Sequence, residues 1–367
     1  MDLSSPAVLS RRMTSLLLRP HPAGSPGDVA GIVQWFGAMQ AQDMASALWS
    51  LGTRLPGGTL AEVNAALERR EAIRTWPMRG TVHLVPPADA HWMLDLMGVR
   101  ALAGAARRRE TIGLSEQAAD RGVEVLAEAL EGRRLTRAQC LAALTDAGIG
   151  VGGQQGYHLL WYASQRGVTC IAPHIGTEQT FVLLDDWVPK PNRPDRDEAL
   201  GIMALRYFRS HGPTTAKDFA GWTGLPMTDV KTGLAAAGAA LTRVTVDGVE
   251  MIADPAVLDD APEDGDPWWT LPGFDEYLLG FKDRSLMLDP AHKQAVVPGG
   301  NGIFQATIVR AGRVVGIWKR TLGKKAVTVD AIPLVTMPLA DRERAERAFT
   351  RYAAFVGLRL IVRWRQP

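Results

Sequence analysis

The sequence predicts a mixed α+β fold, in which three helix-rich segments each end in a two-stranded hairpin and a strand-rich C-terminal part follows. Two kinds of signal support this prediction. Helix-capping pairs, in which a threonine precedes an acid or a glutamine by three residues, occur in every segment. Turn dipeptides then join alternating apolar stretches behind the helices. Helices followed by a hairpin are the plan of a winged helix, so three such segments in series predict three tandem winged-helix motifs.

The composition indicates a packed protein of two or three domains. The chain has 367 residues, of which 46% are hydrophobic and 22% charged. No apolar run reaches the length of a membrane span, and the N-terminal stretch is typical of a helix and not of a signal peptide. Cys140 and Cys170 lack metal-ligand spacing and cannot form a disulfide framework. We therefore expect two small core residues in a reduced, cytoplasmic protein.

Charge is distributed unevenly along the chain. The net charge of +2 does not by itself indicate a nucleic-acid binder. Residues 254–267 carry six acids and no base, whereas 319–325 carry four bases and no acid, and three arginines stand at 107–109. Local patches matter more than the total for binding a polyanion. For any single cluster, an ordinary solvated surface is the alternative.

The first predicted winged helix lies within residues 1–86, after an N-terminal helix. Its expected elements are helices over 28–40 and 43–52, a third helix from the Thr59/Glu62 capping box to about Arg70, and a hairpin that turns at Arg79-Gly80. Residues 87–134 are predicted to be a helical connector.

The second and third copies are predicted over 135–190 and 195–258. The second is expected to have a Thr136/Gln139 capping box, two helices and a hairpin around Gly176-Thr177. The third is expected to have a helix over 197–211, a Thr215/Asp218 capping box, a helix capped by Thr228 that ends near Gly238, and a hairpin at Asp247-Gly248.

The C-terminal region, 268–367, is predicted to be rich in strands. A late helix over 341–356 carries an apolar stripe and is stopped by Gly357. The last segment, LRLIVRWR, alternates apolar and basic residues as a half-buried strand does.

MQAQD, residues 39–43, is the first candidate site. In a continuous α-helix, positions i and i+2 lie about 200° apart and cannot share a target. Gln40 and Gln42 can cooperate only if the helix ends between them, and Asp43 is a good N-cap for the helix that follows. We therefore predict a break at Ala41-Gln42. The alternative is one long helix that carries two surface glutamines.

Other polar residues form weaker candidates. In RTWPMRGTVHLVP, strand alternation puts Thr81 and His83 on one face with Arg79 at the turn, where they could contact phosphates. The alternative is an ordinary hairpin with a satisfied histidine. FDEYLLGFKDR, 274–284, suggests a charged network, which is usually structural. HKQAVVPGGNGIF, 292–304, is either a mobile hairpin that reaches into a groove or an exposed loop. The sequence has no nucleotide-binding or metal-binding motif, so we expect no cofactor and no metal.

Four stretches occur in order over nearly the whole chain: MQAQD, RTWPMRGTVHLVP, HGPTTAKDFAGWTGL and LPGFDEYLLGFKDR. Together they resemble the bacterial winged-helix DNA glycosylases of the AlkZ and AlkX (YcaQ) type. The Gln-x-Gln form is similar to the AlkZ branch, which is associated with self-resistance to azinomycin, whereas the AlkX branch tends to carry Gln-x-Asp. The resemblance implies three tandem winged helices and a β-barrel-like C-terminal region.

The resemblance also implies an activity, namely excision of N7-alkylated guanine from double-stranded DNA and unhooking of interstrand crosslinks. Gln40 and Gln42 would be catalytic and Asp43 secondary. An N7-alkylguanine is already a cationic leaving group, so amides that hold a water suffice and no acid is needed. We expect a monomeric, monofunctional glycosylase without lyase activity. The implied DNA contacts are Arg79, Thr81, His83, Arg284, His292, Lys293, Asn301, Lys319 and Arg320.

Two other functions fit parts of the sequence. A non-catalytic winged-helix regulator would bind DNA and should lose only affinity when Gln40 is replaced. A structural scaffold would not bind DNA at modest salt, whereas a protein that contacts phosphates should bind more weakly as salt rises.

Overall fold

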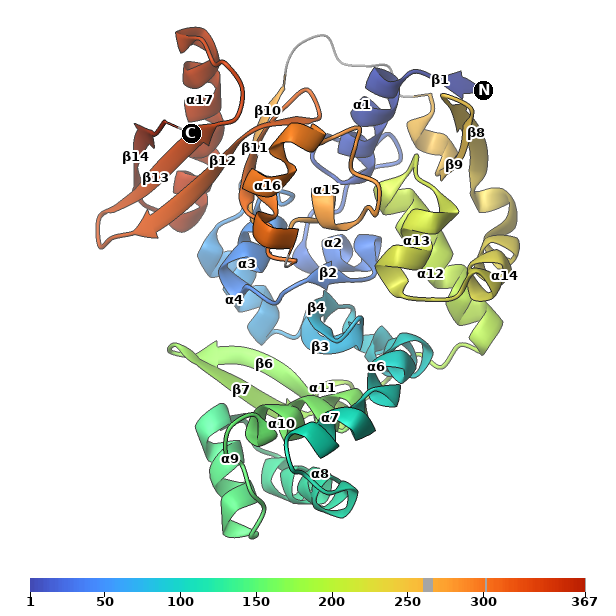
Figure 1. Cartoon of the computed structure of the whole chain (residues 1–367), viewed down its shortest axis with the longest axis vertical. Coiled ribbons are helices and arrows are strands. Elements are labelled where there is room, and N and C mark those ends of the chain that lie inside the picture. Colours follow the sequence, from blue (N-terminus) through green and yellow to red (C-terminus); the bar gives the residue numbers. More distant parts are fainter. Residues whose placement is uncertain (260–266, 301, 367) are drawn as a thin grey trace. The chain divides into compact units, whose positions relative to one another are not determined.

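The computed structural model describes residues 1–259, 267–300 and 302–366. The chain forms two compact units (Figure 1). Unit 1 consists of Met1–Val63, Leu200–Trp222 and Pro226–Pro367, and unit 2 of Asn64–Ala199 and Thr223–Leu225. The chain passes between the units within α4 (Leu60–Glu68), α12 (Arg196–His211) and α13 (Ala216–Thr223), and again between Leu225 and Pro226. The five-part division given above stays a prediction, as does the winged-helix assignment of its three segments.

Unit 1 contains elements from both ends of the chain. Its first elements are β1 (Asp2–Leu3), α1 (Ser5–Ser15), α2 (Val29–Phe36), β2 (Met39–Gln40) and α3 (Met44–Gly52). The middle of the chain adds α14 (Met227–Ala237), β8 (Thr242–Val246) and β9 (Val249–Ala253). The rest are β10 (Trp268–Leu271), α15 (Glu276–Leu279), α16 (Lys293–Val296), β11 (Ala306–Arg310), β12 (Arg313–Leu322), β13 (Ala326–Pro333), α17 (Leu339–Val356) and β14 (Arg359–Trp364).

The C-terminal strands form one five-stranded sheet in the order β10-β11-β12-β13-β14. The first four strands are antiparallel and β14 runs parallel to β13. In the described residues the two outer strands do not pair with each other, so the sheet is a curled half-barrel and not a closed barrel. Helix α17 packs on it through Phe349 and Tyr352, whose rings lie 5.4 and 5.2 Å from that of Trp318. The predicted late helix and its stop at Gly357, with φ of 68°, are confirmed.

A smaller sheet joins β1 in parallel to the β8–β9 hairpin. Asp247 and Gly248 form the two-residue turn with φ of 46° and 78°, as a type I′ turn requires, so the predicted hairpin is confirmed. The predicted cap at Thr228 is wrong. Helix α14 begins at Met227 because the extended Pro226 already occupies the N-cap position, which places Thr228 inside the first turn.

Unit 2 combines one β-sheet with several helices. Its helices are α5 (Ala90–Met93), α6 (Val99–Ala103), α7 (Ala105–Thr111), α8 (Glu116–Leu130), α9 (Arg137–Asp146), α10 (Gln155–Gln165) and α11 (Leu184–Trp187). Its strands are β3 (Ile73–Met78), β4 (Thr81–Val85), β5 (Leu135–Thr136), β6 (Thr169–Ile175) and β7 (Glu178–Leu183). Within the unit these strands follow the order β4-β3-β6-β7-β5.

Local signals explain why several of these elements begin and end where they do. The predicted capping boxes at Thr59/Glu62, Thr136/Gln139 and Thr215/Asp218 all form. Cys140 and Cys170 are fully buried core residues, as predicted, and burial raises the pKa of each thiol to about 12. Across the described ranges, no helix is both long and apolar enough to cross a membrane.

Candidate functional site

The Gln-x-Gln segment lies between two helices. Helix α2 ends at Phe36, and Gly37 follows with φ of 76°, a conformation that favours glycine. Gln40 is the last residue of β2, and α3 begins at Met44. The predicted helix break is therefore confirmed, although the first helix ends before Ala41-Gln42, at the positive-φ glycine. The alternative of one long helix through both glutamines is wrong.

The burial pattern shows how this segment presents its glutamines. Met39 and Ala41 are 1% and 2% exposed, whereas Gln40 is half-buried and Gln42 is exposed. Burial thus alternates with a period of two residues, as in an extended chain, where positions i and i+2 lie on the same face. The strand itself ends at Gln40 and Gln42 lies in a bend, so the shared face of the two glutamines stays a prediction.

Asp43 is the N-cap of α3, as predicted. Its Oδ2 accepts a hydrogen bond from the Ser46 amide at 3.1 Å. The Arg320 guanidinium of β12 lies 3.6 Å from the same oxygen. Asp43 therefore fixes the start of α3 and brings a basic residue of the C-terminal sheet next to the glutamine segment.

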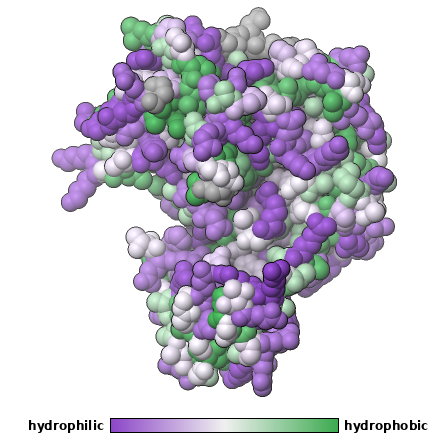
Figure 2. Space-filling view, viewed as in Figure 1, coloured by the Kyte–Doolittle hydropathy of each residue, from purple (hydrophilic) through white to green (hydrophobic). Residues whose placement is uncertain are grey.

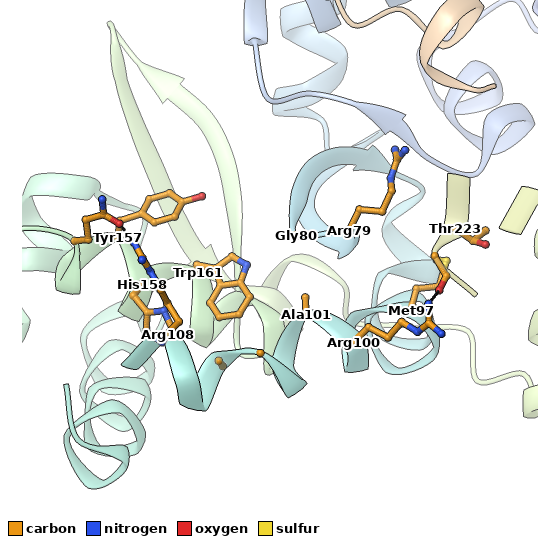
Figure 3. Close-up of a pocket in the computed structure, with 14 residues that line it drawn as sticks. Arg79, Gly80, Met97, Arg100, Ala101, Arg108, Tyr157, His158, Trp161 and Thr223 are labelled. Carbon is orange, nitrogen blue, oxygen red and sulfur yellow. Dashed lines mark hydrogen bonds between the residues drawn. The ribbon is translucent and has the colours of Figure 1, made fainter. Parts of the chain in front are cut away.

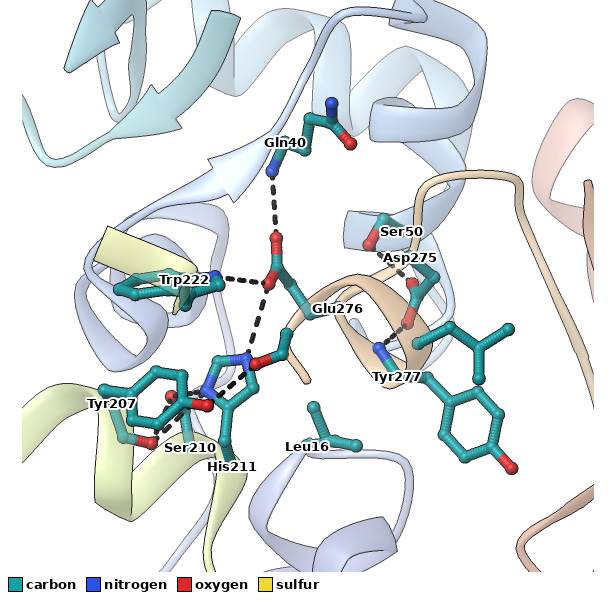
Figure 4. Close-up of polar contacts among 12 residues, drawn as sticks. Leu16, Gln40, Ser50, Tyr207, Ser210, His211, Trp222, Asp275, Glu276 and Tyr277 are labelled. Carbon is teal, nitrogen blue, oxygen red and sulfur yellow. Dashed lines mark hydrogen bonds and ion pairs between the residues drawn. The ribbon is translucent and has the colours of Figure 1, made fainter. Parts of the chain in front are cut away.

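The side-chain oxygen of Gln40 is buried without a hydrogen-bond partner among the described residues. Figure 4 shows that the side-chain carboxamide of Gln40 points away from Glu276, whereas the backbone nitrogen of Gln40 faces it. A buried carbonyl oxygen without a partner loses its hydration without compensation, which costs about 1–3 kcal/mol. Such an atom is a candidate acceptor for a bound water or substrate group.

Glu276, at the start of α15, fixes the backbone of Gln40. Its Oε1 accepts a hydrogen bond from the backbone N–H of Gln40 at 3.1 Å, and its Oε2 accepts one from the indole N–H of Trp222 at 2.9 Å. His211 Nε2 lies 3.3 Å from the same Oε2. Glu276 is only 1% exposed, so three groups compensate for its buried carboxylate (Figure 4).

His211 is held by close packing. Its ring stacks on Tyr207 with centroids 4.5 Å apart, and Ser210 Oγ lies 2.8 Å from its Nδ1. A Cβ at Gly280 would lie 2.2 Å from the imidazole, so only glycine allows α15 to approach this closely. Burial raises the pKa of Tyr207, whose hydroxyl donates to the Gly280 carbonyl at 2.7 Å.

The charged residues of 274–284 do not form the single network that the sequence suggested. Asp275 makes a buried, bidentate pair with Arg54, with both oxygen–nitrogen distances at 2.8 Å. Asp283 accepts from the backbone of Ser285, and Arg284 donates to the Leu278 carbonyl and lies over the Phe304 ring. Arg54 pairs with Asp275, and His211 and Trp222 contact Glu276. These contacts could not be predicted from the sequence, because the partners lie far apart along the chain.

The predicted residues of the first hairpin lie together in unit 2. The hairpin turns at Arg79-Gly80 as predicted, and Arg79 Nη2 lies 3.3 Å from His83 Nε2. His83 Nδ1 lies 2.9 Å from the Thr81 carbonyl oxygen. Arg79 is exposed, whereas His83 is completely buried. The histidine therefore holds the arginine rather than facing solvent.

The remaining predicted DNA contacts lie in unit 1, apart from Asn301, which is outside the described residues. Lys319 is exposed on β12 beside Arg320, and Figure 2 shows hydrophilic side chains that project from this sheet. His292 and Lys293 lie in short helical turns, Pro290–His292 and α16, so the described part of 292–304 is not the predicted hairpin. The basic hairpin of this region is instead the one between β12 and β13.

In the part of the chain that the structure describes, no group of three or more potential ligands could hold a metal ion.

Comparisons with known proteins all point to one kind of protein. The model of a family described as "DNA glycosylase AlkZ-like" matches residues 33–355. A curated relative from Streptomyces sahachiroi, named "Interstrand DNA cross-link repair glycosylase", is 29% identical over 370 residues, which cover 95% of each chain. The solved structure of Streptomyces sahachiroi DNA glycosylase AlkZ matches with a TM-score of 0.82 and 26% identity, and covers 100% of both chains.

Proposed function

Because this chain belongs to the AlkZ-like family of DNA glycosylases, we propose that it hydrolyses the N-glycosidic bond of N7-alkylated guanine in double-stranded DNA. The proposal includes guanines in interstrand crosslinks, which the name of the Streptomyces sahachiroi relative supports, and it extends to the crosslinks of azinomycin. The observation that carries the proposal is the buried side-chain oxygen of Gln40, which has no partner among the residues described and sits on a backbone fixed by Glu276.

The proposed step needs no general acid. The C1′–N9 bond breaks, and its electron pair neutralises the positive charge that alkylation placed on the guanine ring. The oxygen of a water then bonds to the oxocarbenium-like C1′. The carbonyl oxygens of Gln40 and Gln42 accept hydrogen bonds from this water and face the developing positive charge.

The water loses its proton as its oxygen bonds to the sugar. We assign the primary path to solvent, because Gln42 and Asp43 are exposed. Asp43 is a secondary acceptor, since its Oδ2 already caps α3 and lies 3.6 Å from Arg320. Neutralising Asp43 should therefore slow the reaction much less than removing either glutamine.

The proposed enzyme is monofunctional. A lyase activity would need an amine that attacks C1′ as a Schiff-base nucleophile, which is commonly a desolvated lysine. The lysines of this chain are all solvent-exposed, which supports hydrolysis by water and no strand cleavage.

The proposed DNA contacts are mostly basic side chains, of which Lys319, Lys293 and Arg79 are exposed and Arg320 is half-buried beside Asp43. Lys319, Arg320 and Lys293 would contact phosphates, and Arg79 would do so with His83 and Thr81 behind it. Arg284, His292 and Asn301 also remain proposed contacts. A DNA substrate places the protein in the bacterial cytoplasm with the chromosome.

The test compares release of 7-methylguanine from a methylated duplex by single variants of the two glutamines. Gln40→Ala and Gln42→Ala should each slow release by about 10²–10³-fold, the loss typical of one preorganised polar group. Binding to a duplex with an abasic-site analogue should survive. The matched control is Gln34→Ala, which removes an exposed glutamine from α2 and should change neither measurement.

A double variant that releases 7-methylguanine at the wild-type rate would sink the assignment of the glutamines. The finer claim is tested by giving the wild type a duplex with a defined azinomycin crosslink. Failure to separate the strands, together with release of 7-methylguanine, would limit the activity to monoadducts.

A further inference from the structure

Unit 2 contains a cavity of about 610 Å³ to which the proposed reaction assigns no ligand, although Arg79 in its lining is a proposed DNA contact. Its lining includes Arg79, Arg100, Arg108, His158, Tyr157 and Trp161. None of its described lining residues is acidic. We call this the basic cavity (Figure 3). Three guanidiniums and no carboxylate create a site for an anion.

One polar group in the basic cavity lacks a partner. His158 is only 4% exposed, and its Nε2 has no hydrogen-bond partner among the described residues. Burial, with nearby Arg109 and Arg108, lowers the pKa of His158, so the ring is neutral near pH 7. A neutral imidazole offers one donor and one acceptor, which suits the polar edge of an uncharged ligand group.

Aromatic side chains lie next to this histidine. The Trp161 ring centroid lies 5.2 Å from that of His158, and Tyr157 is 44% exposed. Figure 3 shows Tyr157, Trp161 and Arg108 on one side of the basic cavity, with Arg79 and Arg100 on the other. Aromatic faces bind nucleobases by stacking, whatever the base.

The guanidiniums are held in place by neighbours. Arg108 donates to the side chain of Gln154, and Arg100 donates to the Gly224 carbonyl. Arg79 lies beside His83. Arginines held in this way lose less side-chain entropy when they bind a phosphate.

We propose that the basic cavity binds one unpaired nucleotide of a DNA strand, with its base against Trp161 and Tyr157 and its phosphate against the arginines. The proposal rests on the glycosylase function proposed above, because excision of a base leaves the opposing base without a partner. The ligand must be aromatic and anionic at once, and a nucleotide is both. His158 would hydrogen-bond the edge of the base.

Fluorescence anisotropy with three labelled duplexes tests this proposal. One duplex is fully paired, the second carries one extrahelical nucleotide, and the third carries an extrahelical abasic sugar-phosphate in its place. The wild type should bind the second most tightly. Trp161→Ala should weaken that binding by about 5- to 150-fold, the range for loss of one stacked base, and leave the paired duplex unaffected.

The matched control is Trp187→Ala, which removes a half-buried tryptophan of the same unit that lies under Arg70 and outside the basic cavity. Tyr157→Ala removes an exposed ring and tests the proposal without risk to the fold. His158→Phe keeps an aromatic side chain but removes both ring nitrogens, so it should lower affinity for the duplex with the extrahelical nucleotide and not for the one with the abasic sugar-phosphate.

Equal affinity of the wild type for all three duplexes would overturn the proposal. Competition by free dGMP at the affinity of the extrahelical nucleotide would overturn the assignment to a DNA strand. These outcomes leave the release of 7-methylguanine untouched. Conversely, if the glutamine variants released 7-methylguanine at the normal rate, the proposed function would be wrong, but the binding preferences measured by anisotropy would still hold.

Discussion

Replacing Glu276 by glutamine tests whether the carboxylate that fixes the Gln40 backbone matters for catalysis. Oε1 of Glu276 accepts from the Gln40 amide and Oε2 from the Trp222 indole, at 3.1 and 2.9 Å. In Glu276→Gln one of these oxygens becomes an NH2 group. Whichever way the new amide turns, its NH2 faces an N–H donor, and the charge opposite His211 is lost.

The cost follows from these contacts. A hydrogen bond to a charged group contributes about 1.5–3 kcal/mol, and a buried donor left unsatisfied costs about 1–3 kcal/mol. Glu276 is 1% exposed, so solvent cannot compensate. We therefore expect the free energy of unfolding to fall by about 3–5 kcal/mol. The melting temperature should then fall by about 6–20 °C for a unit of this size.

The assay separates stability from catalysis with a neighbouring carboxylate. Asp275→Asn breaks a buried pair with Arg54 but leaves the Gln40 backbone bond in place. Both variants should have a lower melting temperature than the wild type, measured by circular dichroism. Well below either midpoint, only Glu276→Gln should release 7-methylguanine more slowly, by about 10²-fold, because a displaced catalytic group loses its alignment. The reasoning is refuted if Glu276→Gln melts within about 2 °C of the wild type or keeps its full rate.

Three further predictions concern packing, pH and salt. A Cβ at Gly52 would lie 2.4 Å from the Phe355 ring, so Gly52→Ala should lower the free energy of unfolding by about 1–3 kcal/mol in urea titrations. Burial and two nearby arginines lower the pKa of His158 below 6.5, so the unfolded chain takes up its proton first. Stability should therefore be lost as the pH falls through 6.5, less so in His158→Gln. Lys324 and Lys325 lie at the turn between β12 and β13. Replacing either one by alanine should reduce the slope of the logarithm of DNA affinity against the logarithm of salt concentration by about one.

Each of these predictions has a contradicting result. Gly27 has open space around its Cβ position, so Gly27→Ala is the packing control, and equal stability of both alanine variants would contradict the Phe355 contact. Identical pH profiles for the wild type and His158→Gln would contradict the pKa argument. Lys190→Ala removes an exposed lysine between α11 and α12 and should leave the salt slope unchanged. An equal effect there would contradict DNA binding by the β12–β13 hairpin.

The features predicted correctly from the sequence depend on near neighbours along the chain. Asp43 caps α3 through a residue three positions away, and the turn at Arg79-Gly80 depends on two residues with positive φ. The break around Gln40 was predictable from such a cap. The exception is Thr228, because α14 begins one residue earlier, at Met227, with the extended Pro226 in the N-cap position.

The features that the sequence did not reveal depend on contacts between distant residues. Gln40 and Glu276 are 236 positions apart, and no periodicity links them. The three arginines at 107–109 show the same limit, because three consecutive arginines lie in three different environments. Arg107 is exposed, Arg108 lines the basic cavity, and Arg109 is buried over Tyr162. Sequence alone showed only a cluster of charge.

The discontinuity of unit 1 has a consequence for how the chain folds during synthesis. Leu3 of β1 pairs with Val246 of β8, and β13 is completed only by β14 at 359–364. Unit 2 consists almost entirely of one continuous stretch, Asn64–Ala199, and can become compact while the ribosome is still at work. The first 63 residues must wait, with apolar surface uncovered, for partners that emerge much later. Slower folding and chaperone dependence should therefore concentrate in unit 1, which holds Gln40 and Gln42.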